Sequence, residues 1–212
     1  MARRFGWALG LLVPVAACSN PPAPPPAPPA PTVSDTDRSF VTALTQANLA
    51  EVQAGDLASK TSNKASIRKL GSQMSNEHSQ LNEKLGTLAK AKGIDVPTQP
   101  NEQQQAVYQK LQGERASRFN NDYVDSELDG HKALEPVLNL EINQGSDADL
   151  KKLAGDTLPV IQLHVKELEA LKTGKTPRRL RHGAAAATIP PVVQSAAPAA
   201  LAPAPATAPA AQ

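Results

Sequence analysis

The chain has a single cysteine, so it cannot form an internal disulfide. Aromatic residues make up only 3% of its 212 residues. Strands favour aromatic and β-branched side chains, so a core of Leu, Val, Ile, Met and Ala favours helices over a sheet sandwich. The formal net charge is only +2 and no nucleic-acid-reading motif is present. We therefore expect an all-α protein without a nucleic-acid partner.

Motifs for the common enzyme chemistries are also absent. The sequence has no glycine-rich phosphate loop, no nucleophile elbow and no His-Glu-x-x-His motif. No serine or cysteine of the central region stands out beside a base. Hydrolase and nucleotide-binding functions therefore have no residues to support them, and we expect binding or a structural role rather than catalysis.

The N-terminus has the features of an export signal. Arg3 and Arg4 precede a short apolar run over residues 5–17, which is too short to span a bilayer. The run ends in Val-Ala-Ala before Cys18, a pattern that resembles the lipobox of bacterial lipoprotein signal peptides. The resemblance implies a signal peptide at residues 1–17, cleavage before Cys18, and palmitate or similar acyl chains that anchor this cysteine in a membrane. The alternative is a secreted protein with a chance cysteine at the cleavage site.

The residue after Cys18 indicates which of the two membranes would hold the lipid anchor. An Asp there would resemble the signal for retention in the inner membrane, but the sequence has Ser19. We therefore expect a lipid anchor in the cell outer membrane, a domain that faces the periplasm, and components of the cell envelope as candidate partners.

Proline and alanine dominate both flanks of the central region. Residues 18–33 hold the anchor cysteine and a proline-rich linker, which is typical of a polyproline II spacer. Residues 176–212 begin with a basic stretch that contains Arg179 and continue as an Ala/Pro-rich segment. We expect a disordered tail, and the alternative is a basic patch that contacts anionic lipid or cell-wall polymer.

Residues 34–175 show helical periodicity and no strand-like alternation. Long amphipathic segments joined by short connections predict an antiparallel four-helix bundle with an extra short helix. The boundary signals, in chain order, are an N-cap pattern at Ser34 and Asp37, a second N-cap at Asn63, a stop at Gly93, a short helix at 102–112, and a turn and cap at Gly145–Asp147.

Five polar residues interrupt the apolar stripes of these helices. At a rise of about 1.5 Å per residue, their offsets from the nearest turn differ by only a few ångströms, so they can meet at mid-bundle. Imidazole and carboxylate ligands together suit Fe, Mn, Zn or Cu. The predicted metal site consists of Glu51, His78, Glu127, His131 and His164, and the same core position can instead hold a small ligand.

Two other interpretations of this polar cluster stay open. It can be a buried hydrogen-bonded network that serves only structure, in an envelope-interaction or stress-resistance module without catalytic activity. It can also belong to a redox enzyme, but the di-iron pattern of two Glu-x-x-His motifs is incomplete. Glu77 and His78 are adjacent and so point about 100° apart, and Ile161 stands three residues before His164.

Several spaced motifs over about residues 38–173 resemble the domain-of-unknown-function 4142 family, which consists of ferritin-like bundles of exported bacterial proteins. The family has no established activity, so the resemblance implies a ferritin-like fold and no reaction. The matching elements are Phe40-Val41, Ala50-Glu51-Val52, Gly55, Met74-Ser75-Asn76-Glu77-His78 with Glu77 in the place of an Asp, Phe119-Asn120-x-x-Tyr123, His131, and Thr157-Leu158-Pro159 with His164.

Overall fold

The structure is a computed structural model that describes residues 33–177 and Arg179. The predicted signal peptide, the anchor residue Cys18 and the proline-rich residues up to 32 lie outside the described residues. The rest of the predicted tail lies outside them too. Among the described helices, none combines the length and apolar character needed to cross a membrane.

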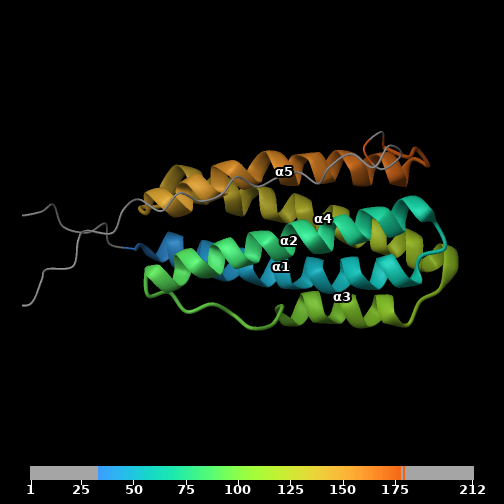
Figure 1. Ribbon diagram of the computed structural model, residues 1–212, viewed down its shortest axis with the longest axis horizontal. Coiled ribbons are helices and arrows are strands. Elements are labelled where there is room, and N and C mark those ends of the chain that lie inside the picture. Colours follow the sequence, from blue (N-terminus) through green and yellow to red (C-terminus); the bar gives the residue numbers. More distant parts are fainter. Residues whose placement is uncertain (1–32, 178, 180–212) are drawn as a thin grey trace, which may run out of the picture. The chain divides into compact units, whose positions relative to one another are not determined.

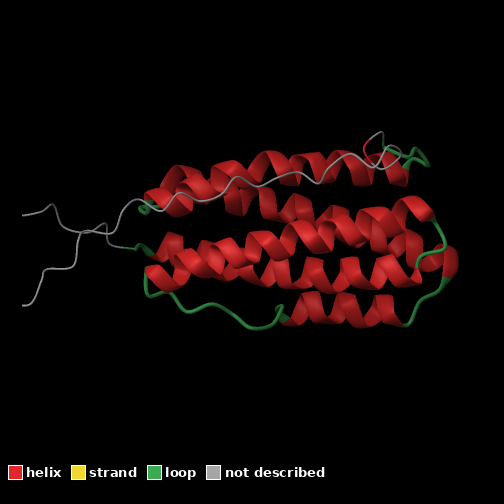
Figure 2. Cartoon of the chain, viewed as in Figure 1, coloured by secondary structure: helices red, strands yellow, loops and turns green. Residues whose placement is uncertain are grey.

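The described part of the chain is all-α, without a strand, which confirms the predicted fold class (Figure 2). The short helix expected at 102–112 is present with those bounds. The five helices are α1 (Asp35–Thr61), α2 (Ala65–Ala91), α3 (Glu102–Gln112), α4 (Ala116–Gln144) and α5 (Ala148–Lys172).

Four long helices form an antiparallel bundle, and the short α3 lies outside it (Figure 1). In the bundle α1 packs against α2 and α4, and α5 packs against the same two helices. Helices α2 and α4 run in the same direction, so the chain must return along the bundle between them (Figure 1). Helix α3 is part of this return and packs on α1 and α4.

The first helix begins as the sequence predicts, and the second does not. Ser34 Oγ accepts a hydrogen bond from the Asp37 amide, and the Asp37 side chain accepts one from the Ser34 amide in return. Asn63 was expected to cap α2, but the cap position is Lys64, which provides no side-chain hydrogen bond. The Asn63 carboxamide oxygen instead accepts a hydrogen bond of 2.6 Å from Asn120 on α4.

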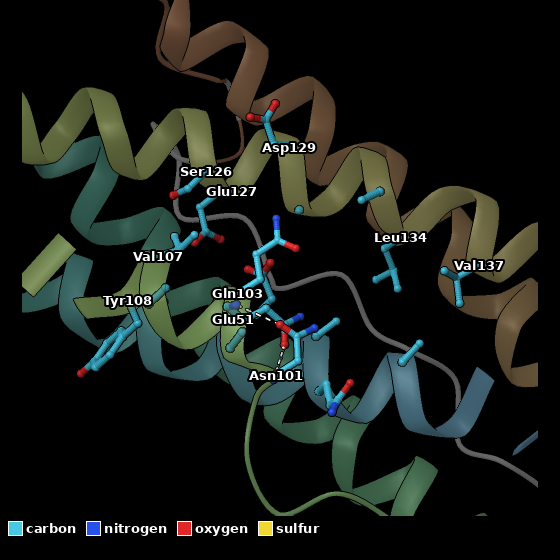
Figure 3. Close-up of a pocket in the computed structure, with 18 residues that line it drawn as sticks. Glu51, Asn101, Gln103, Val107, Tyr108, Ser126, Glu127, Asp129, Leu134 and Val137 are labelled. Carbon is cyan, nitrogen blue, oxygen red and sulfur yellow. Dashed lines mark hydrogen bonds between the residues drawn. The ribbon is translucent and has the colours of Figure 1, made fainter. Parts of the chain in front are cut away.

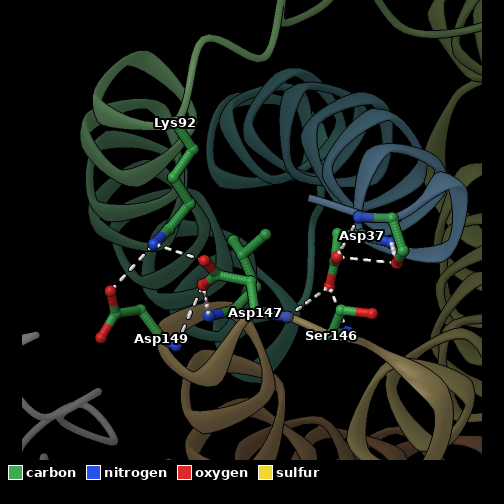
Figure 4. Close-up of polar contacts among 7 residues, drawn as sticks. Asp37, Lys92, Ser146, Asp147 and Asp149 are labelled. Atoms are coloured by element: carbon green, nitrogen blue, oxygen red, sulfur yellow. Dashed lines mark hydrogen bonds and ion pairs between the residues drawn. The ribbon is translucent and has the colours of Figure 1, made fainter. Parts of the chain in front are cut away.

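Polar contacts join the start of α1 to the turn between α4 and α5 (Figure 4). Asp37 Oδ1 accepts hydrogen bonds from the amides of Ser146 (3.0 Å) and Asp147 (3.1 Å). Lys92, at the end of α2, pairs with Asp147 at 2.7 Å and with Asp149 at 2.9 Å. Burial would raise the pKa of Asp37, but the hydrogen bonds it accepts outweigh this effect and lower the pKa to about 2. These contacts connect the start of α1, the end of α2 and the start of α5 at this end of the bundle.

Close approach of α1 and α2 depends on two glycines. A Cβ atom added to Gly55 would lie 2.5 Å from the carbonyl oxygen of Gly71 and 2.9 Å from the amide nitrogen of Ser75. A Cβ on Gly71 would lie 2.7 Å from the carbonyl oxygen of Gly55. The backbones of the two helices therefore touch where neither residue has a side chain.

The apolar core is divided into two clusters, and each contains residues of all four long helices. One lies toward the α4–α5 turn and includes Phe40, Leu44, Leu81, Leu85, Leu138 and Leu150. The other includes Ala54, Leu70, Met74, Phe119, Tyr123 and Leu168. Along the helices, the residues between the two clusters include Glu51, His78, His131 and His164, and Glu127 lies beside Leu128 at the edge of the second cluster. The clusters thus hold the four helices on both sides of a buried polar layer.

Candidate metal centre

The structure brings together all five residues of the predicted site. One ring nitrogen from each of His78, His131 and His164 lies within 4.8 Å of the other two. Ligand atoms of Glu51, Glu127 and His131 form a second group with the same spacing. The five residues therefore form two triads, an imidazole triad and a carboxylate triad, which share His131.

Each bundle helix supplies part of this layer because each interrupts its apolar stripe at the same height. Glu51 comes from α1, His78 from α2 and His164 from α5. Glu127 and His131 lie one turn apart on α4 and so share a face. All three histidines are buried, with at most 1% of each residue exposed.

In each of the three rings, one nitrogen, called the outer nitrogen here, forms a hydrogen bond to an oxygen atom. His78 Nδ1 donates to Asn48 Oδ1 at 2.9 Å, and His131 Nδ1 donates to the backbone carbonyl of Glu127 at 2.8 Å. His164 Nε2 donates to Glu77 Oε2 at 2.6 Å. A neutral imidazole has one N–H, so these bonds place the protons on the outer nitrogens. The inner nitrogens, His78 Nε2, His131 Nε2 and His164 Nδ1, are left with lone pairs.

These inner nitrogens face one another. His131 Nε2 and His164 Nδ1 lie 3.2 Å apart, although neither has a proton to donate in this arrangement. His78 Nε2 is buried and has no hydrogen-bond partner among the described residues. The three ring centroids are 5.2 to 5.6 Å apart. One nitrogen of each ring therefore lies within reach of a single buried cation, and none of the described residues satisfies His78 Nε2 by a hydrogen bond.

Burial lowers the pKa of two of the three imidazoles. It lowers the pKa of His78 to about 3, and the positive charges that His131 and His164 can carry act in the same direction. It also lowers the pKa of His164, although the hydrogen bond to Glu77 acts against this effect. Neutral imidazole is the form that ligates a metal.

The two carboxyl groups lie on the other side of the His131 ring. Glu51 Oε1 is 3.4 Å from His131 Nδ1. Burial would raise the pKa of Glu51, but the positive charge that His131 can carry and a hydrogen bond with Glu127 outweigh this effect and lower the pKa. Burial and the charge of Glu51 raise the pKa of Glu127 well above its usual value. The pKa values of the two carboxyl groups are therefore shifted in opposite directions, and Glu127 holds its proton more strongly than Glu51.

Three residues around the triad were not predicted from sequence. Glu77 was set aside because it points away from His78, yet it reaches His164 on α5. Arg179, which the sequence places in the basic tail, donates to Glu77 Oε1 at 2.6 Å and approaches Glu167 at 3.6 Å. Asn48 precedes Glu51 by one helical turn, and its position in the apolar stripe of α1 was the one available signal.

A pocket of about 570 Å³ opens beside the carboxylate triad, between α1, α3 and α4 (Figure 3). Glu51 and Glu127 line it, and none of the three histidines does. Val107 of α3 is 37% exposed and lines this space.

Comparison with known proteins places the chain in a family. The family model described as "Domain of unknown function (DUF4142)" matches residues 22–171. No curated protein and no solved structure matches the chain. The match covers the whole bundle up to the last turn of α5, including all residues of both triads. The chain therefore belongs to the DUF4142 family, as the spaced motifs of its sequence indicate.

Proposed function

We propose that the bundle binds one divalent transition-metal ion through the imidazoles of His78, His131 and His164. The observation that carries this proposal is the hydrogen bond on the outer nitrogen of each ring. Such bonds fix the tautomer and the ring orientation of metal-ligating histidines in proteins. Here they direct three unprotonated nitrogens to one buried point, and an uncompensated polar cluster at that point would destabilise the fold.

The chemistry of the donors narrows the choice of ion. Neutral imidazole suits Zn, Cu and Fe, and the neighbouring carboxyls extend the set to Mn. Three protein ligands leave a coordination position for water or another small ligand, as in catalytic rather than structural zinc sites. The side chains supply the binding and orientation of the ion, and no residue pattern of this chain assigns a reaction to it.

The surrounding residues support the same assignment. Glu77 orients His164, and its charge is held by Arg179, whose side chain is only 13% exposed. Burial would raise the pKa of Glu77, but hydrogen bonds from His164 and Arg179 outweigh it and lower that pKa. A carboxylate behind a ligating imidazole strengthens the ligand. Glu51, close to Nδ1 of His131, has the position for the same role on a second ring.

We further propose that the protein acts in the cell envelope, held to the outer membrane by acyl chains on Cys18 and facing the periplasm. This part of the proposal rests on the signal-like first 17 residues and the lipobox-like sequence before the cysteine. A metal-binding bundle on a proline-rich spacer would then sample periplasmic ions or envelope components.

Metal content of the full-length chain tests the metal proposal. The purified protein is stripped with a chelator, reloaded separately with Zn(II), Cu(II), Fe(II) and Mn(II), and analysed for bound metal after gel filtration. We expect one ion per chain for at least one metal, and loss of binding in His78→Ala and His164→Ala. His182→Ala is the matched control, because His182 is the only histidine outside the bundle sequence.

Failure to bind any of the four ions stoichiometrically would contradict the proposal, as would equal loss of binding in the His182→Ala control. In that case the polar layer would be a structural network. His78→Leu would then keep or raise the free energy of unfolding, because it replaces a buried polar group by an apolar one.

A further inference from the structure

The imidazole triad is closed to solvent, so an ion needs a path to reach it. Its three histidines are buried, and none of them lines the pocket between α1, α3 and α4. Two apolar clusters cover the polar layer from above and below along the bundle axis. The carboxylate triad is different, because two of its members line the pocket and the third, His131, belongs to both triads.

Small residues create the pocket. Ala43, Ala47, Ala50 and Ala54 recur along the face of α1 that lines it, and Gly130 and Ala133 line it from α4. Larger side chains at this spacing would fill the space between the helices, as in a close-packed bundle. Helix α3 covers the gap without filling it.

The inner end of the pocket carries unsatisfied oxygen atoms. Glu51 and Glu127 are 9% and 4% exposed, and Oε2 of each is buried without a hydrogen-bond partner among the described residues. Buried carboxyl oxygens without partners cost free energy, which a bound cation would offset. The lining residues also include Asp129 and the amide side chain of Asn101, and no Lys or Arg. The lining is thus suited to a cation and carries no positively charged side chain that would attract an anion.

We propose that this alanine-lined pocket is the route by which a hydrated divalent cation reaches the three imidazoles. Glu51 and Glu127 form the transfer site on that route. The cation first exchanges water for their carboxyl oxygens at the inner end of the pocket. It then passes the His131 ring, which both triads share, to the imidazole triad. This inference rests on the proposed metal binding and assigns the pocket and the carboxyls a separate role in the rate of uptake.

Uptake kinetics of the full-length chain separate the route from the site. Cobalt(II) is mixed with metal-free protein in a stopped-flow instrument, and its visible absorption reports binding. Ala50→Trp and Ala47→Trp place a large side chain in the pocket, and each position is half-buried, so the helix can accommodate the change. Ala170→Trp is the matched control, because Ala170 is half-buried on α5 and does not line the pocket.

We expect both pocket variants to take up cobalt at least about tenfold more slowly than the control, which corresponds to about 1.4 kcal/mol added to the barrier. Their equilibrium affinity should match that of the control, because the imidazoles are unchanged. Glu51→Gln should also lower the association rate constant. If a pocket variant loses its helical circular dichroism, Ala43→Trp at the outer end of the stripe replaces it.

Equal uptake rates in the pocket variants and the control would overturn the route and leave the metal site intact. Absence of cobalt binding by the unaltered chain would overturn both proposals. Equal reductions of rate and affinity in the pocket variants would show damage to the site itself, and would also count against a separate route.

Discussion

Arg179 donates a hydrogen bond of 2.6 Å to one oxygen of Glu77, whose other oxygen accepts from His164 at 2.6 Å. A residue beyond the end of α5 is thereby connected to a candidate metal ligand in the middle of that helix. The guanidinium thereby holds in place the carboxylate that accepts the hydrogen bond of His164 Nε2.

Removal of this guanidinium should weaken metal binding without removing a ligand. We expect Arg179→Ala to lower metal affinity by about tenfold, the lower end of the effect of losing an outer partner of a ligating histidine. Arg179→Lys should restore part of the loss, since it keeps the charge but not the planar donor geometry. Titration with a competing chelator measures the affinity. The control is Arg38→Ala, an exposed arginine on α1, and a similar loss there would contradict the connection through Glu77.

Two glycine-to-alanine substitutions should have opposite effects on stability, one at the α1–α2 contact and one at an open position of α5. Gly55→Ala should destabilise the protein by about 1 to 3 kcal/mol, because its Cβ would overlap the backbone of α2. Gly155→Ala should stabilise it by about 0.5 to 1 kcal/mol, since this position in α5 is open and alanine favours helix. Urea unfolding followed by circular dichroism compares the two variants. A neutral Gly55→Ala would show that the two helices can separate at little cost.

The raised pKa of Glu141 predicts that stability falls as pH rises from about 4.5 to about 8. Burial, followed by a hydrogen bond and repulsion from Asp37, raises the pKa of Glu141 from 4.5 to about 8. The folded state therefore holds a proton that the unfolded state has released between these values. Stability falls by up to about 1.4 kcal/mol per pH unit as pH rises through that window, and the loss ends above the folded pKa.

Comparison of the unaltered chain with Glu141→Gln isolates this contribution. Glutamine is neutral at every pH, so the variant should lose less stability between pH 7 and pH 9, by about 1 kcal/mol. Denaturant unfolding at the two pH values measures the difference. Identical pH dependence of both proteins would mean that Glu141 does not retain its proton in the fold.

Lipid attachment at Cys18 predicts the result of metabolic labelling with a palmitate analogue. The unaltered chain should be labelled and recovered with membranes, and Cys18→Ala should lose the label because the chain has no other thiol. Ser19→Ala leaves the thiol in place and serves as control. Undiminished label in Cys18→Ala would contradict the predicted anchor.

The sequence by itself determined the helices and the height of each polar residue along them. Helical rise is constant, so the spacing of Glu51, His78, His131 and His164 from their turns fixed the level at which they lie. Caps were predictable where the side chain bonds its own helix, as at Ser34, and not at Asn63, whose carboxamide bonds another helix instead.

Only the tertiary structure decided how these residues face one another. The division into two triads, the pairing of Glu77 with His164, and the contact of Arg179 depend on the rotation and separation of packed helices and on the path of the chain after α5. The pocket likewise exists because α3 covers a face of small residues without filling it. Local spacing carries no information about such distances, because they are set by side chains that are far apart in sequence.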